Sequence, residues 1–225
     1  MSPHVRLYVD QPLGTGLPVA IGPEQATYLF AVMRLAVGAG VALFNGRDGE
    51  WLARVVDAGK RRGVLVFSPI RKERTNFIVE KAVELGVARL MPVTTRFTQS
   101  ERWRQDKQLA HAIEAAEQCG ATFVPRVDEV QPLERVLADW PAGRRVHWAD
   151  ESLAPGAGAL VAEPAAPVPS AILIGPEGGF CDDEKTRLRG LPFVRPIRLG
   201  PRILRAETAA IAALVLWQAT AGDWR

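Results

Sequence analysis

The chain has 225 residues, of which 48% are hydrophobic and 24% are charged, and its formal net charge is +3 at pH 7. These proportions are typical of a folded globular protein and exclude a disordered chain. No apolar run approaches the about 20 residues that a membrane-spanning helix needs, and the first ten residues lack the apolar core of a signal peptide. We therefore expect a cytoplasmic protein that does not associate with a membrane.

Cysteine and histidine are too few and too scattered to predict a metal site. The two cysteines, Cys119 and Cys181, form no CxxC pair, and the three histidines have no metal-ligand spacing. We expect reduced thiols and no bound metal.

The first third of the chain has the pattern of a small β-rich unit. Residues 5–10 alternate like a strand, and Pro23 opens a helical stretch that continues to about Gly38. The runs VALF and EWLARVV flank a turn in which glycine follows a polar residue twice, at Asn45-Gly46 and Asp48-Gly49. A turn at AGKRRG leads to a last strand, VLVFSPI. The pattern predicts a small, closed or nearly closed β-barrel over residues 1–70.

From residue 71 onward, helical periods alternate with apolar strands. The first helix places Ile78, Ala82 and Leu85 on one face. The second helix has a similar apolar face, formed by Leu109, Ala112, Ile113 and Ala116. The strands are VARLMPV, FVPRV, RRVHWAD, SAILIG and VRPIRLG, and further helices follow at PLERVLADW, from about Asp182 and from about Leu204. This alternation predicts a parallel, layered α/β domain over residues 71–225.

Basic residues cluster in two places. Between residues 185 and 205 there is no acidic residue and there are seven basic ones: Lys185, Arg187, Arg189, Arg195, Arg198, Arg202 and Arg205. A second group near the start of the α/β domain comprises Arg71, Lys72, Arg74, Arg96, Arg102, Arg104 and Lys107. Such clusters favour a polyanionic partner, because each phosphate contact releases counterions. The alternative is a solvated, arginine-rich surface.

Two glycine-containing segments follow strands of the α/β domain. In AILIGPEGGF, a buried strand ends at Gly175, and Gly178 and Gly179 leave room for close approach of a ligand. In RLGPRILRAETAAIAALVLWQA, Gly200-Pro201 makes a turn before a helix that is apolar on nearly every face. Taken alone, each segment is also compatible with a purely structural turn.

Together these segments resemble the signature of the RsmE-type 16S rRNA uridine-N3 methyltransferases, a branch of the SPOUT class. Further pieces match in the same order, namely VMRL, VGAGVALFNG, KAVELGVARLMPVTTR and AAEQCG before the VPRV strand. The resemblance implies a PUA-like β-barrel that binds RNA at residues 1–70. It also implies an S-adenosylmethionine-binding SPOUT α/β trefoil-knot domain with a parallel sheet at residues 71–225.

The same resemblance implies a homodimer, a partner in 16S rRNA of the small ribosomal subunit, and a set of site residues. The cofactor S-adenosyl-L-methionine would contact Ile174, Gly175, Gly178, Leu199, Gly200, Ile203, Leu204 and Arg205. A loop near residues 148–151 is a weaker candidate. RNA would contact Arg34, Arg71, Arg74, Arg96 and Arg202. Tyr28, where the family often has histidine, Ala121, where it often has arginine, and the loosely matching residues 94–97 depart from the pattern.

Methylation of uridine N3 requires that the N3 proton leave, so that negative charge develops on the carbonyl oxygens of the base. Arg205 is the expected stabiliser of that charge, and Glu207 is expected to act as a base or to orient an arginine. An ordinary first-turn carboxylate is an equal alternative for Glu207. Two other functions remain open: a SPOUT methyltransferase that acts on another RNA such as tRNA, and a non-catalytic RNA-binding ribosome-assembly protein.

Overall fold

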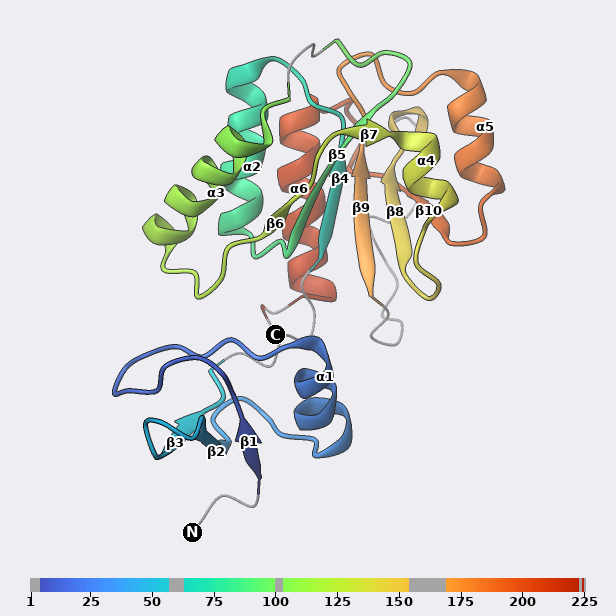
Figure 1. Ribbon diagram of the computed structural model, residues 1–225. Helices are drawn as coiled ribbons and strands as arrows, with labels where there is room; N and C mark the ends of the chain where they lie inside the picture. The colour runs from blue at the N-terminus through green and yellow to red at the C-terminus, as the bar shows by residue number, and fades with distance from the viewer. Residues whose placement is uncertain (1–4, 57–62, 100–102, 154–168, 223, 225) are drawn as a thin grey trace. The chain divides into compact units, whose positions relative to one another are not determined.

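The computed structural model describes residues 5–56, 63–99, 103–153, 169–222 and 224, and its contacts divide the chain into two units, Met1–Lys60 and Arg61–Arg225 (Figure 1). Three features predicted from the sequence fall wholly or mostly outside the described residues: the turn AGKRRG, the loop at residues 151–170, and Arg102.

The described residues of the N-terminal unit form a three-stranded sheet in the order β1-β2-β3. β1 (Arg6–Tyr8) runs parallel to β2 (Gly40–Phe44), and β3 (Glu50–Arg54) runs antiparallel to β2. One face of this sheet packs on a core that consists of Val5, Leu7, Val9, Leu13, Leu29, Val41 and Leu43. The predicted strand at residues 5–10 and the predicted hairpin are both confirmed.

The hairpin turn is held by the Asn45 side chain. Its amide oxygen accepts hydrogen bonds from the backbone N–H groups of Arg47 and Asp48, and its amide nitrogen donates to the Asp48 carboxylate. Gly46 and Gly49 have φ angles of 75° and 80°, which side chains with a Cβ rarely adopt. The two polar–glycine pairs therefore act in the turn as the sequence predicted.

The predicted helix from Pro23 is shorter than expected. An α-helical turn, α1 (Pro23–Ala26), continues as a π-helical stretch, η1 (Thr27–Val32). Arg34 then takes a left-handed conformation, with φ at 52°, and the backbone N–H of Leu35 bonds back to the carbonyl of Leu29. This reversal ends the helix before Gly38.

The C-terminal unit is a parallel sheet between two layers of helices (Figure 1). The strands follow the order β10-β8-β9-β4-β5-β6, and β7 pairs with the end of β5. Their bounds are β4 Val64–Phe67, β5 Arg89–Thr94, β6 Arg126–Val127, β7 Gln131–Pro132, β8 Arg145–Ala149, β9 Ser170–Ile174 and β10 Val194–Ile197. The helices are α2 Lys72–Glu84, α3 Gln105–Cys119, α4 Leu133–Ala138, η2 Glu151–Leu153, α5 Asp182–Gly190 and α6 Ala206–Thr220.

Alternate residues of the central strands build two separate cores, because neighbouring side chains of a strand point to opposite faces. In β4, Leu65 and Phe67 pack with α2, α3 and α6, whereas Val64 and Val66 pack with α4 and α5. Since both faces are covered, these strands are apolar throughout, as parallel strands usually are.

One strand lies in a different unit from the one predicted. The run VLVFSPI, expected to close the N-terminal barrel before a boundary at residue 70, contains β4, which pairs with β5 and β9 in the middle of the C-terminal sheet. The contact boundary lies between Lys60 and Arg61. A continuous apolar run indicates a strand buried on both faces, and only the C-terminal sheet offers two covered faces.

The helical faces were predicted correctly for α2 and only in part for α3. Ile78 and Ala82 are 1% and 0% exposed, but Leu109 and Ile113 of α3 are each 41% exposed. The α3 helix packs instead through its small residues Ala112, Ala115 and Ala116, which allow close approach to its neighbours.

Candidate functional site

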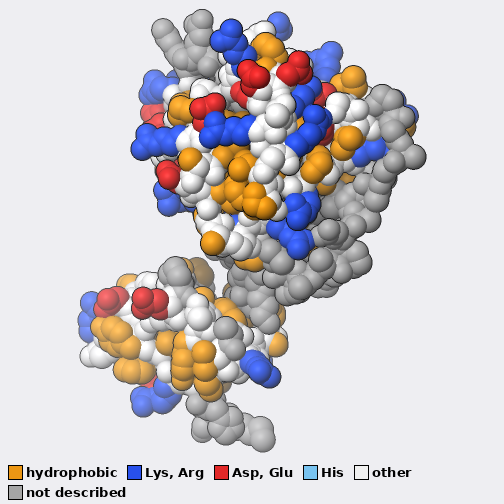
Figure 2. Space-filling model, turned by 90° about the vertical axis from the view of Figure 1, so that its right-hand side faces the viewer, with side chains coloured by type: hydrophobic (Ala, Val, Ile, Leu, Met, Phe, Trp, Pro, Cys, Tyr) orange, Lys and Arg blue, Asp and Glu red, His pale blue; other side chains and the backbone are white. Residues whose placement is uncertain are grey.

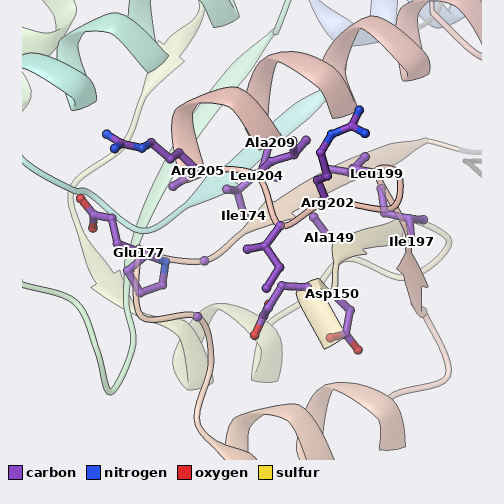
Figure 3. A pocket seen from close by; sticks show the side chains of 17 residues that line it. Ala149, Asp150, Ile174, Glu177, Ile197, Leu199, Arg202, Leu204, Arg205 and Ala209 are labelled. Carbon is purple, nitrogen blue, oxygen red and sulfur yellow. The ribbon is translucent and has the colours of Figure 1, made fainter. Parts of the chain in front are cut away.

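A cavity of about 230 Å³ opens where β8, β9 and β10 end and α6 begins. The carboxyl ends of parallel strands are the usual place for ligands in open α/β sheets. The two glycine segments, far apart in sequence, meet here (Figure 3). The lining residues are Ala149, Asp150, Glu151, Ile174, Gly175, Pro176, Glu177, Gly179, Ile197, Leu199, Gly200, Arg202, Ile203, Leu204, Arg205, Ala206 and Ala209.

The first glycine segment is packed too tightly for side chains. A Cβ at Gly175 would lie 2.7 Å from the Phe180 ring, and one at Gly179, whose φ is 68°, would lie 2.5 Å from a carboxylate oxygen of Glu151. Of the predicted cofactor residues, Gly178 alone does not line the cavity: its Cβ would lie 3.0 Å from the Cβ of Phe97. Glycine at residue 178 is therefore explained by packing against the loop at residues 94–98.

The second segment presents free backbone donors to the cavity. Gly200 has a φ of 114°, which turns the chain between β10 and α6. No hydrogen bond within the described part of the protein uses the backbone N–H groups of Leu199, Ile203 or Leu204. Their side chains, with Ile174 and Ile197, make the wall largely apolar. Unpaired donors beside apolar walls fit a planar heterocycle with polar edges.

Two of the acidic residues that line the cavity, Asp150 and Glu151, are held by basic partners on α5. The Asp150 side chain is fully buried, accepts hydrogen bonds from Ser152 and Arg189, and Arg189 also lies over the Trp148 ring. Burial raises the pKa of Asp150, but the bonds from Ser152 and Arg189 outweigh it and leave the pKa below the usual value. Lys185 of α5 forms an ion pair with Glu151, and the hydrogen bond between them raises the pKa of Lys185.

Arg202 and Arg205 both line the cavity and are exposed, and their side chains leave the loop in opposite directions (Figure 3). Arg205 is the residue before α6, so its position is set by the helix start. Neither guanidinium forms an ion pair with a described residue, so both can meet a bound anionic group.

Glu207 does not line the cavity. Its carboxylate, 12% exposed, forms an ion pair with Arg74 of α2, and its other oxygen is buried without a hydrogen-bond partner. The structure thus places Glu207 beside an arginine, which is one of the two roles that the sequence suggested.

The predicted RNA-contacting arginines are spread over both units. Arg34 lies in the N-terminal unit, whereas Arg71 precedes α2 and Arg96 lies in the loop after β5; these three are exposed. Within the basic segment 185–205, Lys185, Arg187 and Arg189 pair with Glu151, Glu134 and Asp150. On the face in view in Figure 2, basic side chains of the C-terminal unit are accordingly interspersed with acidic ones.

Sequence reasoning missed several lining residues: Pro176, Glu177, Ile197, Ala206 and Ala209. Ala149, Asp150 and Glu151 belonged only to the weaker candidate loop at residues 148–151. Their place in the sequence could have indicated these residues. Residues just after the strands RRVHWA and VRPI come close to the end of the strand SAILI once the three strands lie side by side in one parallel sheet.

No described helix has the length and hydropathy to cross a membrane. Within the same ranges, no group of His, Cys, Asp and Glu has the arrangement of a metal site.

The chain matches two family models that together cover most of its length. The model described as "RNA methyltransferase domain" matches residues 59–218, and "RNA methyltransferase PUA domain" matches residues 21–68. Ribosomal RNA small subunit methyltransferase E of Rickettsia conorii is 28% identical over 228 residues, with 93% of each chain covered.

Two solved structures are similar over nearly the full length. A methyltransferase from Legionella pneumophila in complex with the bound cofactor SAM is 28% identical, with 96% of this chain and 97% of that chain covered and a TM-score of 0.63. Ribosomal RNA small subunit methyltransferase E from Neisseria gonorrhoeae bound to S-adenosyl methionine is 26% identical, with 98% and 99% covered and a TM-score of 0.65. From its matches to these models and to full-length relatives, the chain belongs to the RNA methyltransferase family, as a member of the RsmE type.

Proposed function

We propose that this protein transfers a methyl group from S-adenosylmethionine to N3 of a uridine in 16S rRNA of the small ribosomal subunit. The observation that carries the proposal is the cavity in which both glycine segments meet, with unpaired backbone donors in its wall. Two full-length structural relatives were solved with S-adenosylmethionine, which supports the same ligand here.

The cavity residues fit this cofactor. Ile174, Leu199, Ile203 and Leu204 would enclose the adenine, and the free N–H groups of the second segment would bond to its edge. Asp150 and Glu151 supply negative charge near a cofactor that carries positive charge at its sulfonium and amino groups. When bound, the cofactor supplies an electrophilic methyl group.

Arg205 is proposed to stabilise the negative charge that develops on the uracil carbonyl oxygens as N3 releases its proton to solvent water and takes the methyl group from the sulfonium, which leaves as S-adenosylhomocysteine. Its guanidinium is exposed, lines the cavity and has no ion-pair partner among the described residues, so no ion pair has to break before it meets an anion. A donor placed in advance at a developing charge lowers the barrier more than one that must reorganise.

Glu207 is proposed to orient Arg74 rather than to take the N3 proton. The carboxylate already bonds to Arg74 and lies outside the cavity lining. With Glu207 as its partner, Arg74 is proposed as an RNA contact at the start of α2, and Arg34, Arg71, Arg96 and Arg202 are proposed as further contacts. Steep salt dependence of RNA affinity is expected from such contacts.

A homodimer is proposed through the outer face of α6, defined by Ile211, Ala212, Val215 and Leu216. These apolar residues are only partly buried within the chain, whereas Ala210, Ala213, Leu214 and Trp217 on the other face of the helix are buried. An isologous contact would cover them in both copies. The trefoil knot expected from the resemblance stays a prediction, and the proposed substrate implies that the reaction takes place in the cytoplasm.

Calorimetric titration with S-adenosylhomocysteine separates the methyltransferase from a non-catalytic RNA-binding protein. We expect one binding site per chain, and loss of binding when Leu204→Asp puts a charge into the apolar wall. Absence of binding to the wild-type protein would favour the binding protein. Methylation of tRNA instead of small subunits would favour the other RNA substrate.

A further inference from the structure

The outer face of the N-terminal sheet, defined here by Arg6, Tyr8, Phe44, Glu50 and Leu52, has no part in the cofactor cavity. Strand register places Tyr8, Phe44 and Glu50 in one row and Arg6, Ala42 and Leu52 in the next. The opposite face packs into the core through Leu7, Val41 and Leu43. Tyr8 and Leu52 are nevertheless 51% and 65% exposed, so large apolar side chains stand on the solvent side.

An aromatic and cationic cluster lies at the centre of this face. The Tyr8 ring meets the Phe44 ring edge-on, with centroids 5.8 Å apart and an interplanar angle of 69°. The Arg6 guanidinium lies over the Phe44 ring at 4.9 Å from its centroid, and the Arg6 side chain is 64% exposed. Phe44 is therefore the base of the cluster, and the Tyr8 ring and the outer plane of Arg6 face solvent.

Both exposed groups are held in place. Arg6 donates to the Glu50 carboxylate at 2.7 Å, and the Tyr8 hydroxyl donates to the Asp10 carboxylate at 2.7 Å. The latter bond raises the pKa of Tyr8, so the phenol stays neutral. Because partners restrict both side chains before binding, little conformational entropy is lost when a ligand stacks on them.

We propose that the outer face binds an unpaired RNA base, which stacks on the Tyr8 ring and the outer plane of Arg6. Aromatic rings and arginine planes are the groups on which proteins stack splayed-out bases. Arg47, in the turn between β2 and β3, and Arg54, the last residue of β3, are both exposed and are the groups proposed to meet the phosphates on either side of the base. The carboxylates of Asp10 and Glu50 already accept bonds from Tyr8 and Arg6, which limits their repulsion of phosphate.

The inference rests on the proposed function, since it gives an RNA substrate a second point of contact. Figure 2 shows hydrophobic side chains at the surface of the N-terminal unit together with basic and acidic ones. The exposed aromatic ring and arginine plane of the outer face are the groups that suit stacking of a nucleic-acid base. The family match of residues 21–68 to an RNA methyltransferase PUA domain agrees with an RNA-binding role for this unit.

The test measures the affinity of the full-length protein for a fluorescently labelled decauridine by anisotropy, over a series of salt concentrations. Tyr8→Ala should weaken binding about 5- to 100-fold, as expected for loss of one stacked base. Tyr8→Phe keeps the ring and should stay within about twofold of the wild type. Arg6→Ala should also weaken binding, whereas Arg126→Ala, which removes an exposed arginine of the C-terminal unit that is likewise paired with a carboxylate and lies outside both basic clusters, serves as the control for lost charge.

Two readouts separate stacking from general effects. Tyr8→Ala should leave the slope of affinity against salt unchanged, because stacking releases no counterions. Binding of S-adenosylhomocysteine should match the wild type, which shows that the C-terminal unit is folded. Wild-type RNA affinity in both Tyr8→Ala and Arg6→Ala would overturn the inference and leave the outer face to a protein partner. Failure of the wild-type protein to bind S-adenosylhomocysteine would instead overturn the proposed function.

Discussion

Glu207, in the first turn of α6, forms an ion pair with Arg74 of α2 across the two helix starts. The carboxylate that sequence reasoning offered as a base is thus bound to a cation, and its second oxygen is buried without a partner. This pairing makes Glu207 a positioning residue in our account.

Glu207→Gln should therefore lower stability more than turnover. Removal of one partner from a largely buried polar pair costs about 1–3 kcal/mol. We expect chemical denaturation to show that Glu207→Gln and Arg74→Met each lower the free energy of unfolding by this amount. The double variant should lose less than the sum of the two single losses, because both remove the same ion pair. A general base would instead lose about 100-fold or more in kcat. A drop of that size at unchanged stability would contradict the positioning role.

A larger side chain at residue 178 should disturb the cofactor site by pushing against Phe97. The sequence predicts that Gly178 leaves room for a ligand, but the space beside Gly178 is filled by Phe97. Gly178→Val should lose affinity for S-adenosylhomocysteine because the displaced loop shifts the glycine segment. Adding Phe97→Gly, which removes the Cβ that the valine meets, should restore most of that affinity. If calorimetry shows no recovery in the double variant, the side chain obstructs the ligand directly.

The dimer should depend on the outer face of α6. Val215→Glu would place an unpaired charge in a dry contact, and a folded monomer of 24.5 kDa is expected by light scattering, against a wild-type dimer of twice that mass. Ala213→Glu would not serve this purpose, because Ala213 is 1% exposed within its own chain and a charge there would unfold it. A wild-type protein that scatters as a monomer would refute the dimer.

The position of β4 decides which fragment folds. A fragment that begins at Arg61 keeps this central strand and should bind S-adenosylhomocysteine with near wild-type affinity while losing most RNA affinity. A fragment that begins at Arg71 lacks the strand between β5 and β9, so its sheet would be split and circular dichroism should show an unfolded chain. Cooperative melting of the shorter fragment would show that β4 is dispensable.

Periodicity predicted the layered α/β unit, and the resemblance predicted the cavity, for distinct physical reasons. Alternation of helix and strand is local, so the strand Ser170–Ile174 and the helix start at Asp182 could be predicted from spacing. Which strands pair with each other depends on residues that are far apart in the sequence. The pattern therefore placed β4 in the wrong unit and did not reveal Glu177 as a lining residue. The helical periodicity of apolar residues likewise could not show that α3 packs through its alanines rather than through Leu109 and Ile113.

The most direct test of the central claim uses purified protein, labelled S-adenosylmethionine and small ribosomal subunits from a bacterial strain that lacks its uridine-N3 methyltransferase. Mass spectrometry of the digested 16S rRNA should show one new 3-methyluridine with the wild-type protein and almost none with Arg205→Ala, which keeps the fold but lacks the charge-stabilising group. Methylation of another base or of another RNA, or full activity of Arg205→Ala, would contradict the account.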